Sequence, residues 1–375
     1  MNNKLPPLWL VVGLMMFPQI VETIYSPALT GIATRFGVSD GQASQTLSAY
    51  FLAFAVGVVC WGRLCDLIGR RPAMLAGLLT YGLGTLMALL ANQFEVLLLA
   101  RIVSAFGAAV GSVVTQTMLR DSYRGRDLAQ VFSVMGGALS LSPVLGLMSG
   151  GWLVEEWGHL GVFGGLMVLA LAIGMLALGW LPETRPDDMS GVALWPLACR
   201  MLRDVTLWRS ALLVALFNTM LFGYYSLAPF LFAGLGLSVG EFGYSGFGLA
   251  LATLVGSLLN KGLLGKGWAP SSLVRLACIL AFICGIGVWL GQGSLWFLLP
   301  MMGTVVAFGV AIPNVLSQAL LVYREVAGSA GALFGLVYYL LLSLGLAVAA
   351  NLQDLGILLV GCGGLAWLCH GCRST

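Results

Sequence analysis

A single carboxylate lies in the first long apolar segment of the chain. Glu22 is near the middle of the run from Leu8 to about Ala33, which is long enough to cross a bilayer as a helix. Gln19 and Ser26 lie about one turn to either side of it, so the three polar side chains share one helix face. A carboxylate at that depth is costly to bury and usually faces a cavity that carries protons, ions or substrate. The pattern therefore predicts a polar pathway through a membrane.

The composition requires that most of the chain be inside a membrane. Of its 375 residues, 59% are hydrophobic and only 9% are charged, whereas a soluble domain carries about 25% charged residues. The apolar runs are too long and continuous for the short alternating strands of a barrel. We therefore expect an all-α integral membrane protein with twelve transmembrane helices, at about 8–30, 44–63, 72–92, 94–119, 128–154, 160–181, 206–234, 240–264, 270–290, 294–322, 327–350 and 354–370.

The longest polar stretch divides these runs into two sets of six. We expect an N-terminal six-helix bundle over 1–181, a cytoplasmic linker over 182–206 and a C-terminal six-helix bundle over 207–375. Two bundles of this kind are typical of repeat-based transporters, which bind their substrate near the membrane midplane. The first run is expected to remain as a span rather than to be a removed signal peptide.

The positions of the basic residues predict the orientation. If the N-terminus is cytoplasmic, nearly every Lys and Arg between spans falls on the cytoplasmic side and only Arg35 falls outside. This favours a multi-pass protein of the bacterial inner membrane with both termini in the cytoplasm. The basic residues in the loops then do not indicate a nucleic-acid partner. We expect the protein to be a monomer.

Other chemistries find little support. The eight cysteines lie in spans or near their cytoplasmic ends and form no disulfide framework. The tail Cys369–Cys372 has a metal-like spacing but no second pair, so no metal site is expected. The chain shows neither a nucleotide-binding P-loop nor a motif for covalent catalysis. We expect no cofactor and no enzyme activity.

The loop after the second run carries a longer motif. Gly62 to Arg71 resembles the signature between spans 2 and 3 of the major facilitator superfamily. The resemblance implies a charge latch at the cytoplasmic end of the bundles, formed by Asp66, Arg70 and Arg71 with Arg120 or the N-terminus of the eleventh helix as partners. The alternative is that the arginines only follow the positive-inside rule, which would not explain Asp66.

Three more segments resemble motifs of that superfamily. The segment 101–109 is similar to the span-4 motif, whose arginine is linked to proton coupling, although Ser104 and Ala105 replace its usual Gln and Gly. The segment 142–151 resembles the span-5 antiporter motif, which is associated with export and with a kinked helix. Small residues at this spacing let helix backbones approach closely. The resulting candidates for helix packing are Gly107, Gly111, Pro143, Gly146 and Gly150.

The segment 22–29 resembles the span-1 motif of twelve-span drug:proton antiporters, and the whole chain is most similar to their bicyclomycin-resistance type. In that motif the acid usually lies four residues before the proline, where this chain has Thr23. Glu22 is one residue earlier, about 100° around the helix. A coupling role for Glu22 is thus plausible from its position but is not inherited from the motif.

Glu22 and Arg101 are the predicted proton-coupling pair. A carboxyl group at a buried site can exchange a proton near physiological pH, and an arginine keeps its charge and needs a partner or water. Arg101 could pair with Glu22 in one state of a transport cycle. It could equally form constant bonds to backbone carbonyls.

Residues near the middle of the spans are candidates for lining a substrate site. Aromatic side chains with a few polar groups suit large, mostly apolar ligands, although the same aromatic residues could pack against other helices or face lipid. The candidates are Gln19, Glu22, Tyr50, Phe54, Asn218, Phe222, Tyr225, Phe247, Asn314, Tyr338 and Tyr339.

These observations favour a proton-coupled secondary exporter of small organic molecules such as drugs, working by alternating access. One alternative is a dedicated exporter of a siderophore or another polar metabolite, for which Gln19, Asn218 and Asn314 would supply hydrogen bonds. A sensor that keeps the fold without transport is disfavoured by Glu22 and the loop motif. An importer is disfavoured by the span-5 motif.

Overall fold

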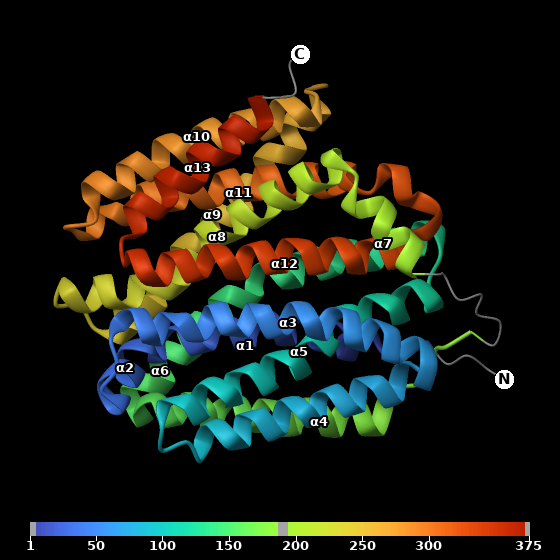
Figure 1. Ribbon diagram of the computed structural model, residues 1–375, viewed down its shortest axis with the longest axis horizontal. Coiled ribbons are helices and arrows are strands. Elements are labelled where there is room, and N and C mark those ends of the chain that lie inside the picture. The colour runs from blue at the N-terminus through green and yellow to red at the C-terminus, as the bar shows by residue number, and fades with distance from the viewer. Residues whose placement is uncertain (1–4, 187–193, 372–375) are drawn as a thin grey trace. The chain divides into compact units, whose positions relative to one another are not determined.

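Helices form every regular element in the part of the chain that the structure describes. The computed structural model describes residues 5–186 and 194–371, and within these ranges the elements are α-helices and short 3-10 helices (Figure 1). A helix satisfies its backbone hydrogen bonds internally, which a segment inside lipid requires. The predicted all-α class is confirmed.

The apolar helices match the predicted spans. Among the described residues, ten helical stretches are long and apolar enough to cross a membrane. One of them, Gln130–Trp180, contains two helices joined at Gly158, whose backbone is non-helical with φ 65°. The last apolar helix, Leu355–Gly371, has 17 residues, or about 25 Å of helix. Division at Gly158 and inclusion of this helix give twelve apolar helices in the described ranges, as predicted.

The chain divides into two compact units. Unit 1 comprises Met1–Gly37 and Ala49–Val192, and unit 2 comprises Val38–Ser48 and Ala193–Thr375. One helix, α3 (Asp40–Ile68), therefore contributes its first nine residues to unit 2 and the rest to unit 1.

Unit 1 is built from helices that pack in pairs. The helix α4 packs against α5, α1 packs against α6, and further contacts join α4 to α6 and α1 to α5. The side chain of Trp61 on α3 donates a hydrogen bond to the carbonyl of Phe106 on α5, at 2.7 Å. The elements of this unit besides α3 are α1 (Leu8–Tyr25), η1 (Ser26–Ala28), α2 (Leu29–Phe36), α4 (Arg70–Leu89), α5 (Phe94–Ser122) and α6 (Gly125–Trp180).

The first span is interrupted by a 3-10 turn at its proline. The α-helix α1 ends at Tyr25, the turn η1 contains Pro27, and α2 continues the span to Phe36. Proline has no N–H and its ring crowds the preceding turn, so the helix tightens locally. This irregularity follows directly after the turn that carries Glu22.

Glycines let α6 approach α1 very closely. A Cβ atom added at Gly146 would overlap the side chain of Thr23, and one added at Gly150 would overlap the carbonyl of Ile24. The other two predicted packing glycines also lie in helix contacts, with Gly107 against Tyr81 of α4 and Gly111 against α1.

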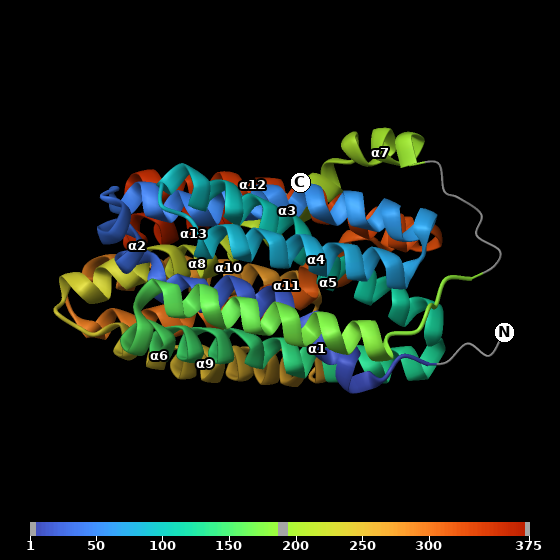
Figure 2. The same ribbon diagram turned by 90° about the horizontal axis from the view of Figure 1, so that it is seen from below.

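Unit 2 has a comparable arrangement of paired helices. The helix α10 packs against α11 and α13, α9 packs against α11, and α8 packs against α12 and α13. The short helix α7 contacts α8 and α12 (Figure 2). The elements are α7 (Leu194–Leu202), α8 (Val205–Gly234), α9 (Val239–Gly265), α10 (Pro270–Gly291), η2 (Leu295–Phe297), α11 (Leu298–Ala319), η3 (Leu321–Val326), α12 (Ala327–Leu352) and α13 (Leu355–Gly371).

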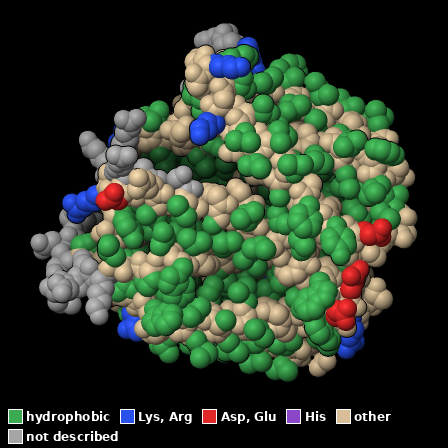
Figure 3. Space-filling view, turned by 180° about the vertical axis from the view of Figure 1, so that it is seen from behind, with side chains coloured by type: hydrophobic (Ala, Val, Ile, Leu, Met, Phe, Trp, Pro, Cys, Tyr) green, Lys and Arg blue, Asp and Glu red, His purple; other side chains and the backbone are tan. Residues whose placement is uncertain are grey.

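The surface is that of a protein surrounded by lipid. Figure 3 shows a face covered mainly by hydrophobic side chains, with charged side chains toward its margins. Large apolar residues such as Leu79, Val168 and Met175 are more than 60% exposed. Exposure on this scale would destabilise a protein in water, and it is expected where the hydrocarbon core is the solvent.

Candidate functional site

A buried arginine in unit 1 is held between two tyrosine rings. The guanidinium carbon of Arg101, on α5, lies 3.9 Å from the ring centre of Tyr25 and 4.5 Å from that of Tyr50. Only 2% of Arg101 is exposed, and both tyrosines are fully buried. A cation over an aromatic face is attracted by the ring quadrupole, and the attraction is worth about 2 kcal/mol or more when the pair is desolvated. The rings therefore stabilise a charge that would otherwise be costly to bury.

Glu22 belongs to the same cluster. It lies on α1 one turn before Tyr25, on the same helix face, and is only 4% exposed. The carboxyl is within electrostatic range of Arg101. Among the described residues, however, the two side chains form no ion pair. The structure thus places the predicted coupling residues together, with the guanidinium held by rings instead of by the acid.

Several polar atoms around this cluster are buried without a partner. In the described part of the chain, Nε and Nη2 of Arg101, the hydroxyl of Tyr50 and Oε1 of Gln19 have no hydrogen-bond partner. Buried polar groups are nearly always paired. These atoms are therefore suited to bind a proton-carrying group, a water molecule or a polar part of a substrate.

The neighbouring position shows why the acid is at residue 22. Thr23 points to α6: its hydroxyl donates to the carbonyl of Gln19 at 2.8 Å, and it packs where Gly146 leaves space. The next residue along the chain is about 100° away around the helix. In this chain position 23 belongs to the α1–α6 contact, whereas Glu22 shares the face of Tyr25.

The loop motif forms a charge cluster around Arg70. This arginine is 2% exposed and makes two ion pairs, with Asp66 at 2.9 Å and with Asp121 at 2.7 Å. It also donates to the carbonyl of Cys65 at 2.9 Å. Three helices, α3, α4 and α5, are thereby joined at one end of unit 1.

The beginning of α4 is capped from the end of α6. The Glu183 carboxylate accepts hydrogen bonds from the backbone N–H groups of Arg70 at 2.9 Å and Arg71 at 3.1 Å. The side chain of Arg71 donates to the carbonyl of Leu178 at 2.7 Å, and Arg185 donates to that of Leu67 at 2.9 Å. A carboxylate at a helix N-terminus pairs free N–H groups and interacts well with the helix dipole.

The predicted latch is thus only partly brought together by the structure. Asp66 and Arg70 are paired, and Arg71 joins the segment that follows α6. Arg120 is exposed, and its neighbour Asp121 is the residue that contacts Arg70.

The predicted substrate residues of unit 2 lie in different surroundings. The amide of Asn218 donates to the carbonyl of Val214 at 2.8 Å, and that of Asn314 donates to Asn260 at 2.6 Å. Phe247 is 56% exposed on the surface of α9. The remaining candidates of both units form ring pairs, which are Tyr50 with Phe54 at 6.1 Å, Phe222 with Tyr225 at 5.6 Å, and Tyr338 with Tyr339 at 4.2 Å.

Three residues of these clusters were not selected from the sequence. Tyr25 is three residues after Glu22 and therefore on its face, which was a usable signal. Asp121 directly follows an arginine that was selected, so its proximity to the loop could have been inferred. Glu183 is 113 residues from Arg70 along the chain, and no local pattern indicates the contact.

The described residues offer no metal site. No group of three or more His, Cys, Asp or Glu side chains gathers in the described ranges. The tail motif ends at Cys372, which lies outside them.

Comparisons with known proteins agree with this architecture. Residues 10–346 match the Major Facilitator Superfamily. A protein of Rickettsia felis named as an uncharacterized transporter is 32% identical over 90% of this chain and 87% of its own length. A chloramphenicol resistance protein of Pseudomonas aeruginosa is 28% identical, covering 83% of this chain and 75% of its own length. A bicyclomycin resistance protein homolog of Haemophilus influenzae is 26% identical over 87% of this chain and 84% of its own.

The fold is also found among solved structures. A crystal structure of a bacterial homolog of the human lysosomal transporter Spinster matches with a TM-score of 0.72 at 16% identity, covering 97% of this chain and 96% of that one. The similarity to the bicyclomycin-resistance type is confirmed by the named relatives. The chain belongs to the Major Facilitator Superfamily and is a multi-pass membrane transporter, not an enzyme.

Proposed function

We propose that this transporter exports small amphipathic organic molecules, drugs among them, in exchange for protons. The observation that carries the proposal is the buried cluster of Glu22, Arg101, Tyr25 and Tyr50 in unit 1. Antiport requires one group that can be charged or neutral, and a carboxyl provides it. Arg101 keeps its charge throughout. Because the rings already stabilise Arg101, the Glu22 carboxyl does not have to stay ionised to pair it.

The same cluster gives the proposed order of events. A substrate that arrives from the cytoplasm favours the deprotonated form of Glu22, and protonation from the outside favours release of the substrate. One proton that moves down a potential of 100 mV supplies ~2.3 kcal/mol. Arg101 is within electrostatic range of the carboxyl, so its position changes the cost of each protonation state.

The drug-resistance names of two relatives support the proposed substrate class. The buried rings supply apolar contact area at little entropic cost, which suits amphipathic molecules. We further propose that the protein works as a monomer in the bacterial inner membrane, with both termini in the cytoplasm.

A dedicated exporter of a polar metabolite such as a siderophore is the second candidate. One observation favours it, because Oε1 of Gln19 is buried without a partner in the described part of the chain and could accept a hydrogen bond from a polar product. The other two amides that would serve such a product already donate to protein groups, Asn218 to Val214 and Asn314 to Asn260.

Substrate-induced proton release tests the proposal. Purified protein in lightly buffered detergent solution would receive chloramphenicol, a lipophilic cation or a hydroxamate siderophore, and the pH change would be recorded. We expect release from the wild type and none from Glu22→Gln. Glu95→Gln is the matched control, since Glu95 is an exposed acid in the first turn of α5.

Each outcome has a distinct meaning. Release by the wild type and by Glu95→Gln alone supports a coupled carboxyl at Glu22, and the active compound identifies the ligand class. Equal release from Glu22→Gln would remove Glu22 from the mechanism. Binding without release from any variant would contradict proton coupling through this site.

A further inference from the structure

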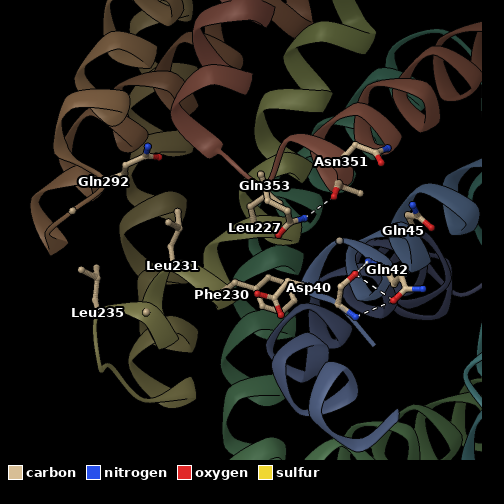
Figure 4. Close-up of a pocket in the computed structure, with 15 residues that line it drawn as sticks. Asp40, Gln42, Gln45, Leu227, Phe230, Leu231, Leu235, Gln292, Asn351 and Gln353 are labelled. Atoms are coloured by element: carbon tan, nitrogen blue, oxygen red, sulfur yellow. Dashed lines mark hydrogen bonds between the residues drawn. The ribbon is translucent and has the colours of Figure 1, made fainter. Parts of the chain in front are cut away.

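Unit 2 contains a cavity that includes none of the residues considered so far. Its volume is about 950 Å³, and it lies where α8 and α12 end and α3 begins (Figure 4). Cavities of this size accommodate drug-sized molecules. All of its lining residues belong to unit 2.

One side of the cavity is apolar. The last turns of α8 contribute Leu227, Phe230, Leu231 and Leu235, as Figure 4 shows. Leu227, Leu231 and Leu235 are spaced four residues apart and follow one face of the helix. This side offers contact area to the hydrocarbon or aromatic part of a ligand.

The other side consists mainly of side chains whose oxygens remain available as acceptors. Both donations printed for the Gln353 amide nitrogen go to the protein, to the carbonyl of Ala350 at 2.8 Å and to the hydroxyl of Ser44 at 3.4 Å. The amide of Asn351 donates to the carbonyl of Ala347 at 2.7 Å. Oε1 of Gln353 and Oδ1 of Asn351 are left without a donor among the described residues.

The only ionisable side chain among the cavity residues is an acid. Asp40, the first residue of α3, lines the cavity, and no Lys or Arg does. Its carboxylate can accept hydrogen bonds but donates none. Gln42 contributes the opposite polarity, because its Oε1 accepts from the backbone N–H of Ser39 at 2.9 Å and leaves its amide nitrogen free to donate. Acceptors and negative charge nevertheless dominate.

The position of Gln353 is held by an unusual backbone. Its φ of 49° is the only positive value at a non-glycine residue in the described ranges. Such a conformation costs about 1–3 kcal/mol and persists only where the surroundings enforce it. Here the two side-chain hydrogen bonds fix the residue in the turn between α12 and α13, and its carbonyl oxygen is fixed with it.

We propose that this cavity is a separate binding site for amphipathic amine cations. The ammonium N–H groups would donate to the Asp40 carboxylate and to Oε1 of Gln353, while the apolar body would contact Leu227, Phe230 and Leu231. In the proposed orientation of the chain the cavity opens to the outside of the cell. Only this assignment of the side rests on the proposed function, since binding requires neither transport nor a proton gradient.

A pair of probes that differ in one group tests the proposal. Purified protein in nanodiscs of neutral lipid would be titrated with 1-naphthylmethylamine, which is a cation at pH 7, and with 1-naphthylmethanol, which is neutral. We expect Asp40→Asn to weaken amine binding about tenfold, as for the loss of a charge-assisted hydrogen bond, and to leave alcohol binding unchanged.

Gln353→Gly is a second variant that favours correct folding, because glycine adopts a positive φ without strain. We expect it to weaken amine binding while thermal stability is kept or raised. Glu95→Gln, which changes another exposed acid in a first helical turn, should leave the amine affinity unchanged.

The remaining outcomes would overturn the proposal. They are a wild type that does not bind the amine saturably, an Asp40→Asn variant with wild-type amine affinity, and an equal loss for amine and alcohol. Loss of all amine binding in Glu22→Gln would place the cation at the cluster of unit 1. Failure of proton coupling would be seen in the proton-release assay and would leave this titration unaffected.

Discussion

The guanidinium carbon of Arg101 lies 3.9 Å from the ring centre of Tyr25, one helical turn after Glu22. The buried charge is therefore stabilised by an aromatic face, and no ion pair with Glu22 forms within the described residues. A permanent ion pair would fix the carboxyl in its charged form, because each partner would penalise neutralisation of the other. An arginine held by rings can influence the acid without fixing its protonation state.

Tyr50 tests whether the ring or the hydroxyl matters. Its ring centre is 4.5 Å from Arg101, and its hydroxyl has no partner among the described residues. Tyr50→Leu removes the ring and should lower stability by about 2 kcal/mol or more and reduce transport. Tyr50→Phe keeps the ring and removes an unpaired hydroxyl, so stability should be unchanged or slightly higher.

Unfolding in detergent and drug transport into everted vesicles would measure both effects. A Tyr50→Phe variant that is stable but transports poorly would assign the hydroxyl to the substrate or to a proton path. Equal effects of the two substitutions on stability would contradict the stabilisation of Arg101 by the ring.

The two partners of Arg70 should differ in importance. The side chain of Asp121 is 14% exposed, and that of Asp66 is 37% exposed. Removal of the more buried partner leaves the charge of Arg70 poorly compensated, at a cost of about 3 kcal/mol, whereas a partly exposed pair is worth at most about 1 kcal/mol. Asp121→Asn should therefore lower the thermal unfolding temperature much more than Asp66→Asn.

Asp66→Asn should instead act mainly on the transport cycle. If Asp66 belongs to a latch, the substitution should slow turnover more than it weakens substrate binding. Rates from a transport assay and affinities from ligand titration separate the two. A variant in which only binding suffers would show that the latch interpretation is wrong.

The sequence predicted the fold better than it predicted side-chain partners. Twelve apolar runs and the all-helical class follow from length and composition, because a membrane admits few other structures. The direction in which each helix face points does not follow in the same way. Lipid is as apolar as the protein interior, so hydrophobic periodicity does not separate Phe247, which is exposed, from Phe54, which is buried.

Polar residues inside the spans were more informative. Glu22 and Arg101 were selected because charges at that depth are rare and costly, and the structure places them in one cluster. Partners distant in sequence were missed, as for Glu183 and Arg70. The choice of Arg120 over Asp121 shows that one residue along a helix changes the direction of a side chain by about 100°.

Gly69 and Glu183 should show strong coupling. Gly69 has φ 104°, and an added Cβ would lie 2.6 Å from Oε2 of Glu183, the carboxylate that caps α4. Gly69→Ala should therefore cost ~1 kcal/mol for the backbone and, in addition, most of the cap, which is worth about another 1 kcal/mol. In a Glu183→Ala background only the backbone part remains to be lost.

A double-mutant cycle measured by unfolding in SDS–detergent mixtures would determine this coupling. We expect Gly69→Ala to cost about 1 kcal/mol less in the Glu183→Ala background than in the wild type. Strictly additive effects would show that the Glu183 cap and the space at Gly69 are independent.

Ser48 and Ser343 provide a test of movement. Each hydroxyl donates to the backbone carbonyl of the other residue at 2.8 Å, and the two oxygens are 3.4 Å apart. Both residues belong to unit 2, but α3 continues from Ser48 into unit 1. Alternating access by rocking of one bundle against the other would displace one attachment of α3 in every cycle, and we predict that it is this one.

In a cysteine-free background, Ser48→Cys combined with Ser343→Cys should form a disulfide on mild oxidation, stop transport, and recover when reduced. Each single variant, oxidised in the same way, is the control and should keep its activity. Full transport by the cross-linked protein would show that α3 stays attached to α12 throughout the cycle. The displaced attachment would then have to lie on the unit 1 part of α3, where Trp61 bonds to Phe106.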